Sequence, residues 1–447
     1  MTVRYSESTR DALQLAWNVN AANTNLERWL DICEHEGWSE TIENLPLLAK
    51  LFGASWYFTR LVFFRGLEIK KYFDDMQTDP DFSKSSMLEF IRDNDIDSDL
   101  EDRFERLRLA KNEIMLQILL SQLTDRLDDE QSEVALSYLA EVTLQFAVHL
   151  VMDEAEGDSQ YPAILAMGRM AGKEMNYGSD LDLIFLYSGE SSEHAALTRR
   201  IQLLLRHIAT PTACGLLYEI DMRLRPHGTS GTLISPASYF IEYHSENRDI
   251  WERQMMTRCR PVVDENHLAS EALSSISSKI YAIYDEDHLR MQILDMRFKV
   301  EKELGNPKGK FEIKRGPGGI MDIDFITHFL QLGYGHEFPE LKTASTRNAL
   351  RQLGNKSLLT GDQVGLLLHS YDFLKRVEGV LRVADLKSVS AFSQDPEQIQ
   401  TLARAMGYAR DAESAEAEGF IDEYLTVTGQ VRNCFTDVVG EYPGSGL

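Results

Sequence analysis

The chain has 447 residues, of which 43% are hydrophobic and 26% charged, so it is long enough for two or three domains with substantial cores. Its formal net charge of -25 argues against sequence-independent binding to nucleic acid, which needs a basic face that displaces counterions. The four cysteines form no CxxC pair and the first residues lack the apolar segment of a signal peptide, so we expect a cytoplasmic protein that does not contact a membrane.

Residues 1–155 are expected to form a helical N-terminal region. Apolar residues recur at helical spacing over 100–127 and 130–151. The apolar segment 47–64 contains two basic residues and is too short and too charged to span a bilayer, so we expect a buried helix there. The acidic loop 154–161 is predicted to be a hinge into the next region.

Residues 156–270 are expected to mix strands and helices around two aspartates. A strand at 164–167, a glycine-rich turn that opens a short helix, and a strand at 181–187 follow one another. Side chains alternate along a strand, so Asp180 and Asp182 point the same way. Two carboxylates on one face raise each other's pKa unless a cation lies between them. The pattern predicts a divalent metal that carries a nucleotide; the alternative is a sheet edge protected by charge.

The glycine-rich turn is the predicted phosphate cradle of this site. Glycine allows a close approach of the backbone, and the N-terminus of a helix attracts anions. We therefore expect Gly168, the amides around Gly172, and Ser179 to surround phosphate groups.

A third acid follows in segment 218–226, where apolar and charged residues alternate as in a half-buried strand. The charged face carries Asp221, Arg223 and Arg225. Asp221 is expected to complete the metal site or to act as a base beside it. The two arginines are expected to bind phosphate oxygens through forked hydrogen bonds, or else to pair with nearby surface acids.

Residues 251–260 are predicted to continue as a helix. Glu252 is expected to support an arginine of the site, and Arg258 is expected to add positive potential. Trp251 is expected to lie in the core rather than to stack on a base.

Residues 271–447 are expected to form a helical C-terminal bundle. Helical periodicity predicts helices over 287–303, 320–332, 364–385, 398–406 and 419–439. Asp322 and Asp324 begin the second of these helices, where they either cap it or lie near the nucleotide.

The motifs and their order resemble those of the glutamine synthetase adenylyltransferase family, within the nucleotidyltransferase superfamily. A Gly-x-x-x-Gly turn precedes Ser-Asp-Leu-Asp-Leu-Ile-Phe (179–185), Asp-Met-Arg-Leu-Arg-Pro-x-Gly-x-Ser-Gly (221–231), Trp-Glu-Arg (251–253) and Gly-Gly-Ile-x-Asp-Ile-Asp-Phe (318–325). Arg169 departs from the wider superfamily, in which Gly or Ser commonly follows the first glycine. The resemblance implies an α+β fold: a polymerase-beta-like mixed sheet, the nucleotidyltransferase core, flanked by mostly helical regions.

The resemblance further implies magnesium-dependent transfer of AMP from ATP to a tyrosine hydroxyl of glutamine synthetase. Asp180, Asp182 and Asp221 would hold two Mg²⁺ ions. Lys314 and Arg315 lie in a segment that the family places close to the active site, so they become candidates for phosphate or substrate contact. A PII-type signal protein is a possible regulatory partner.

The direction of the reaction stays open. Family members carry two such cores, one that attaches AMP and one that removes it by phosphorolysis, and this chain has one Asp-x-Asp core. It is therefore a single-unit relative or one half of a longer protein, with attachment favoured and removal as the alternative. A small-molecule nucleotidyltransferase and a nucleotide-sensing binding module are the rival interpretations.

Overall fold

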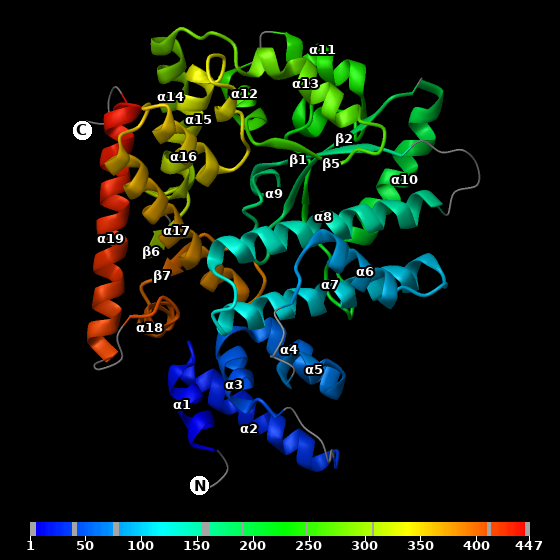
Figure 1. Ribbon diagram of the computed structural model, residues 1–447, viewed down its shortest axis with the longest axis vertical. Helices are drawn as coiled ribbons and strands as arrows, with labels where there is room; N and C mark the ends of the chain where they lie inside the picture. Colours follow the sequence, from blue (N-terminus) through cyan, green and yellow to red (C-terminus); the bar gives the residue numbers. More distant parts are fainter. Residues whose placement is uncertain are drawn as a thin grey trace.

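The computed structural model is mostly helical and contains a small mixed sheet, which confirms the expected α+β class. Helices from the first half of the chain lie on one side of the sheet, and helices from the second half lie beside and above it (Figure 1). The structure describes residues 6–37, 43–74, 80–153, 161–189, 191–246, 249–305, 308–408 and 413–442. The predicted hinge falls mainly on 154–160, outside the described residues.

In the described residues, eight α-helices precede the sheet, as expected for a helical N-terminal region. They are α1 (Glu7–Leu15), α2 (Val19–His35), α3 (Leu45–Ala54), α4 (Trp56–Arg65), α5 (Lys71–Asp74), α6 (Lys84–Asn94), α7 (Leu100–Leu123) and α8 (Asp129–Asp153). The prediction of one helix over 47–64 is wrong, because the helix breaks at Ser55. The Ser55 hydroxyl accepts the N–H of Phe58 and donates to the carbonyl of Val383 at 2.6 Å, so it begins α4 and attaches it to a distant helix.

Among the described helices, α8 alone is long and apolar enough to cross a membrane by length and composition. Of its apolar window, 78% is buried inside the molecule. Burial of this kind is typical of the core helix of a globular protein.

The sheet has the strand order β3-β2-β1-β5, and β4 pairs with β2. Its strands are β1 (Ala163–Met167), β2 (Leu181–Tyr187), β3 (Ile220–Asp221), β4 (Ser235–Pro236) and β5 (Cys259–Val263), and α9 (Gly168–Gly172) and α10 (Ser191–Ala209) follow β1 and β2. Strand β1 is antiparallel to β2 and β5, whereas β2 is parallel to β3 and β4. The two strands predicted on either side of the glycine-rich turn are confirmed.

The predicted strand 218–226 is wrong beyond Asp221. The backbone N–H of Arg223 donates to Asp221 Oδ1 at 2.8 Å, which turns the chain as in an Asx-turn. Arg225 donates to the carbonyls of Met222, Thr229 and Gly231. These local bonds to the backbone replace the continuation of the strand.

The described C-terminal part is helical apart from one short antiparallel pair of strands. Its helices are α11 (Ala237–Ser245), α12 (Ile250–Met256), α13 (Leu268–Ile280), α14 (Glu286–Leu304), α15 (Ile320–Tyr334), α16 (Thr346–Asn355), α17 (Gly361–Val383), α18 (Pro396–Ala405) and α19 (Glu413–Val438), and the strands are β6 (Lys310–Glu312) and β7 (Ala391–Ser393). All five helices predicted here are confirmed within a few residues. The helix predicted over 251–260 instead ends at Met256, because the chain from Cys259 pairs with β1.

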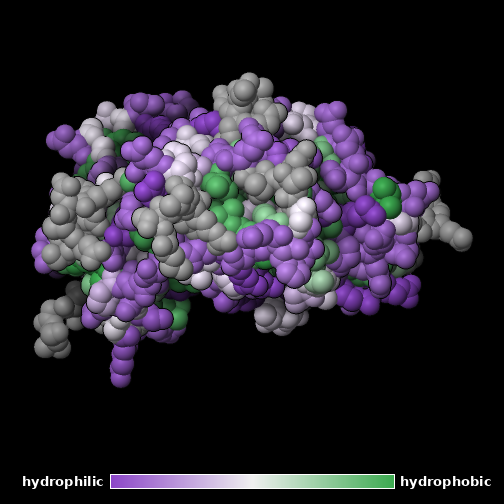
Figure 2. Space-filling model, turned by 90° about the horizontal axis from the view of Figure 1, so that it is seen from below, coloured by the Kyte–Doolittle hydropathy of each residue, from purple (hydrophilic) through white to green (hydrophobic). Residues whose placement is uncertain are grey.

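Two hydrophobic cores meet at the sheet. Leu181, Leu183 and Phe185 belong to a core shared with α7 and α8, whereas Ile184 and Leu186 face a core shared with α13, α15 and α17. Because both cores continue from the sheet into the helices, the division into regions 1–155, 156–270 and 271–447 stays a prediction. The face seen in Figure 2 is largely hydrophilic, as expected when most apolar residues lie in such cores.

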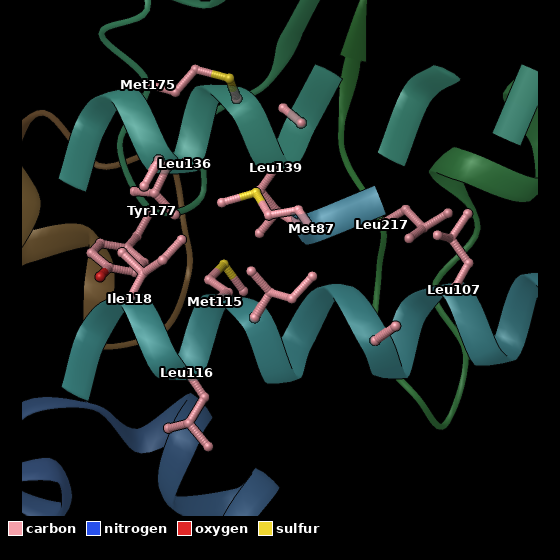
Figure 3. Close-up of a cluster of buried hydrophobic side chains, with 14 of the residues drawn as sticks. Met87, Leu107, Met115, Leu116, Ile118, Leu136, Leu139, Met175, Tyr177 and Leu217 are labelled. Atoms are coloured by element: carbon pink, nitrogen blue, oxygen red, sulfur yellow. The ribbon is translucent and has the colours of Figure 1, made fainter. Parts of the chain in front are cut away.

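The first of these cores also holds the loop that leads into β2. Met175 and Tyr177 from this loop lie against α7 and α8, close to Ile118 and Leu136 (Figure 3). The Tyr177 hydroxyl donates to Gln122 Oε1 at 2.5 Å. The loop before the two aspartates is therefore packed as tightly as the core itself.

We expect Gly178→Ala to destabilise the protein by roughly 2 kcal/mol or more. Gly178 has a φ of +60°, and a Cβ there would lie 2.5 Å from the carbonyl carbon of Leu386, so strain and overlap add. Gly365→Ala in α17 is the matched control, since a Cβ meets nothing within 4 Å there and helix propensity improves. The free energy of unfolding, measured by urea titration, checks both; equal losses in the two variants would contradict the close approach at Gly178.

Candidate functional site

Three aspartates converge at the start of the two parallel strands β2 and β3. The register pairs Asp182 directly with Asp221, and Asp180 immediately precedes β2. One carboxylate oxygen from each residue lies within 4.8 Å of the other two. The structure thus brings together the three acids predicted from the sequence, and adjacent-strand spacing is the reason.

The electrostatics of this acid cluster favour a bound cation. Burial, together with Asp180 and then Asp221, raises the pKa of Asp182 to about 7. Asp221 differs, because side-chain hydrogen bonds from Arg223 lower its pKa. The Nε of Arg223 lies 2.7 Å from Asp221 Oδ2. Three carboxylates at this separation match the oxygen ligands that Mg²⁺ prefers, so the donor set fits the predicted metal.

The glycine at the start of α9 permits this arrangement. Gly168 has a φ of +57°, and a Cβ there would lie 2.8 Å from Asp182 Oδ2. Its N–H donates to the carbonyl of Arg258 at 2.9 Å. Any side chain at Gly168 would therefore press on the central carboxylate.

The other two residues of the predicted phosphate cradle are placed differently. At Gly172, a Cβ would lie 2.9 Å from the carbonyl oxygen of Ala344, so this glycine packs against the C-terminal helices. Ser179 is buried, and its hydroxyl oxygen accepts from the N–H of Asn176 at 2.9 Å and from Arg382 at 3.3 Å. Of the three, Gly168 alone lines the cavity beside the acids.

A cavity of about 470 Å³ opens beside the acids, and we call it the acid cavity. It is lined by Gly168, Asp182, Asp221, Arg223, Leu224, Trp251, Gln254, Met255, Arg258 and His328. The expectation that Trp251 lies in the core is wrong: the residue is 40% exposed and lines this cavity. Gln254 and His328 were not predicted, because neither belongs to a pattern that differs from that of a packed helix.

Arg258 is engaged in buried ion pairs rather than adding unpaired charge. It donates to Glu174 and, at 3.2 Å, to Asp324. Glu174 lies in the loop between α9 and β2, and it also accepts from the N–H of Thr346 at 2.7 Å and the hydroxyl of Tyr371 at 2.8 Å. Burial opposes the charge of Glu174, but the surrounding cations, with Arg258 first, outweigh it and lower its pKa to about 2.

Lys314 lies close enough to influence the acid cluster, as its positive charge counteracts the raised pKa of Asp182. Burial, and then neighbouring Arg169, lower the pKa of Lys314 to about 8. Arg315 instead donates to the hydroxyl of Ser390 at 3.2 Å, beside β7. The two candidates are thus separated, with Lys314 on the side of the acids.

The structure also shows which contacts are made by the two acids at the start of α15, for which helix capping and a place near the nucleotide were the two expected alternatives. Asp322 is fully buried and accepts the N–H of Gly318 at 2.8 Å, so it holds the turn before α15, whereas Asp324 reaches Arg258. Glu252 accepts from the hydroxyl of Tyr243 at 2.6 Å, and no arginine among the described residues donates to it, so the structure does not support the expected role beside an arginine.

Comparison with known proteins places these features in a family. The family model described as glutamate-ammonia ligase adenylyltransferase matches residues 46–275, and the model described as PII-uridylyltransferase matches residues 295–439. The first match contains the whole sheet, the acid cluster and more than half of the chain.

Three similar relatives carry the name bifunctional glutamine synthetase adenylyltransferase/adenylyl-removing enzyme. The protein from Nitrosomonas europaea is 34% identical over 57% of this chain and 28% of its own length. The proteins from Idiomarina loihiensis and Aromatoleum aromaticum are 31% and 28% identical, over 62% and 78% of this chain and 32% and 38% of their own lengths. The chain thus spans about a third of the length of these relatives. The matched family model, the motifs and the acid cluster agree with one another. The chain therefore belongs to the glutamate-ammonia ligase (glutamine synthetase) adenylyltransferase family.

Proposed function

We propose that this chain is a magnesium-dependent nucleotidyltransferase that transfers AMP from ATP to a tyrosine hydroxyl of glutamine synthetase. The observation that carries the proposal is the parallel register of β2 and β3, which sets Asp221 beside Asp182 in a chain of this family. A binding module that only senses nucleotide has no need of three converging carboxylates, so the cluster favours catalysis over that rival.

Asp180, Asp182 and Asp221 would hold two Mg²⁺ ions, which neutralise phosphate charge and stabilise both the entering and the leaving oxygen of an in-line displacement. The tyrosine oxygen would bond to the α-phosphorus and lose its proton to water, while the bond from the α-phosphorus to the bridging oxygen breaks and pyrophosphate leaves. Arg223 lowers the pKa of Asp221, so this carboxylate is a weak base and stays in the ionised form that a metal ligand requires. We therefore assign Asp221 to the metal rather than to proton transfer.

The positive groups around the acids divide into two roles in this proposal. Lys314 and Arg223 lie near the carboxylates and would contact the phosphates directly. Three other predicted residues form hydrogen bonds with protein groups instead: Arg225, Arg315 and Ser179. They would support the phosphate site by holding its loops in place.

We favour attachment of AMP, with phosphorolytic removal from adenylylated glutamine synthetase as the alternative. Both directions use the same acids and the same in-line geometry. The names of the relatives, which cover both activities, support either direction. The match of residues 295–439 to the PII-uridylyltransferase model supports a search for a PII-type regulator. Magnesium, ATP and a cytoplasmic location belong to the same proposal.

We expect Asp182→Asn to reduce AMP transfer roughly 100- to 1,000-fold or more, because it removes the central carboxylate of the cluster. The measurement is the transfer of label from ATP labelled at the α-phosphate to glutamine synthetase in the presence of Mg²⁺. Asp362→Asn, at an exposed position at the start of α17, is the matched control and should keep full activity.

Removal of AMP from pre-modified synthetase when orthophosphate is supplied, without any attachment, would reverse the direction and keep the site. Label transferred to small hydroxyl compounds and not to the synthetase would support the small-molecule rival. If none of these assays showed transfer or removal of AMP, the proposed substrate would be wrong.

We expect Mg²⁺ to stabilise the wild-type protein and not Asp182→Asn. A ligand that binds only the folded state stabilises it by about 2.7 kcal/mol when its free concentration is 100 times the Kd. Without Mg²⁺, Asp182→Asn should be at least as stable as wild type, because it relieves repulsion among three close carboxylates. Thermal unfolding with and without Mg²⁺ measures both effects, and an equal rise in Tm for the two proteins would contradict metal binding at the cluster.

A further inference from the structure

The acid cavity has a second polar side, which the three aspartates do not use. Gln254 on α12, Arg258 before β5 and His328 on α15 line it and are all more than nine-tenths buried. Metal chemistry requires none of these three side chains. Buried polar groups beside a cavity are instead typical of ligand recognition.

The hydrogen bonds of this side leave donors without acceptors. Gln254 Nε2 lies 3.1 Å from His328 Nδ1. An amide nitrogen only donates, so Nδ1 accepts and the ring carries its proton on Nε2. Burial lowers the pKa of His328 to about 4, which keeps the ring neutral near pH 7. Among the described residues, neither His328 Nε2 nor Arg258 Nε has a hydrogen-bond partner.

The groups that face the His328 ring are consistent with a neutral donor. Arg258 lowers the pKa of the ring, and Asp324 and Glu174 oppose it, but both carboxylates are already bonded to Arg258. No described carboxylate is hydrogen-bonded to His328 Nε2. A buried donor left in this state costs free energy until a ligand supplies an acceptor.

The remaining wall of the cavity is apolar and partly aromatic. Leu224, Trp251 and Met255 line it, and Trp251 is 40% exposed. An indole ring in a cavity wall can stack on a flat ring. A phosphate gains nothing from such a wall, whereas a nucleobase offers both a flat face and unprotonated ring nitrogens that accept hydrogen bonds.

We propose that this side of the acid cavity binds the purine base of the nucleotide substrate, with Trp251 against its face and His328 Nε2–H donating to an unprotonated ring nitrogen. The inference rests on the proposed function, because it assumes that a nucleotide occupies the acid cluster. It adds a recognition site for the base, built from α12 and α15. Gln254 acts through His328, since it selects the tautomer that can donate.

The first test measures binding of ATP with Mg²⁺ to the full chain by calorimetry. We expect His328→Leu to weaken ATP binding about tenfold, because one buried hydrogen bond is lost. His328→Gln places an amide donor near the position of Nε2 and should stay within about threefold of wild type. Inorganic triphosphate with Mg²⁺ has no base and should bind all three proteins equally.

The second test identifies the accepting atom with 1-deaza-, 3-deaza- and 7-deaza-ATP, in each of which a C–H replaces one ring nitrogen. Wild type should bind one of the three about tenfold more weakly than ATP. His328→Leu should bind that analogue and ATP equally, since the same contact is already absent.

Two results with His328→Leu would overturn the inference, and one result with wild type would do so as well. One is that His328→Leu binds ATP as tightly as wild type. The other is that it loses the same factor for inorganic triphosphate, which would show that His328 only maintains the structure. If wild type bound triphosphate as tightly as ATP, this result would exclude the base site. It would not contradict the proposed transferase function. Failure of wild type to bind either compound would count against the proposed function itself.

Discussion

The buried carboxylate of Glu174 is the contact on which the geometry of the acid cluster depends. It joins the loop that leads into β2 to Arg258 at the edge of the sheet, to Thr346 at the start of α16 and to Tyr371 on α17. A buried charge is tolerated only when it is fully paired and hydrogen-bonded, and here it is. The loop is therefore fixed in one position, and the aspartates at its end are held with it.

A second buried glutamate extends this connection. Glu378 on α17 pairs with Arg169 on α9 and with Arg382, which in turn donates to the hydroxyl of Ser179. The apolar core between α7 and α8 holds the same loop from the other side (Figure 3). The helical flanks are thus part of the site, because they position the loop before the acid cluster from two directions.

The acid cavity combines two kinds of surface that a nucleotide needs. Carboxylates on β2 and β3 suit cations, which would in turn bind phosphates, and the wall around Trp251 and His328 suits the proposed base. The second surface depends on the packing of α12 against α15. In the proposed function, a change in that packing would affect base binding, whereas a change in the acids would affect binding of the metal and the phosphates.

The sequence by itself determined the features that depend on local periodicity. Repeats of 3.6 and 2 residues in the sequence predicted the helices and the strands on either side of the glycine-rich turn. The repeat of 2 residues also placed Asp180 and Asp182 on one face. Such repeats can be read from the sequence because they arise between residues that are close along the chain. The sequence also indicated the third acid, Asp221, because it is a charged residue in a segment where apolar and charged residues alternate. That segment nevertheless turns after Asp221, because bonds from Arg223 to this side chain outweigh the alternation.

Only the tertiary structure decided which distant residues meet. The register of two parallel strands places Asp221 beside Asp182, and no local pattern encodes that register. Trp251 and His328 lie on different helices with ordinary apolar spacing, and they line one cavity only because those helices pack together. The physical reason is that periodicity shows which face of an element is buried, whereas the partner of that face is chosen by the packing of the whole chain.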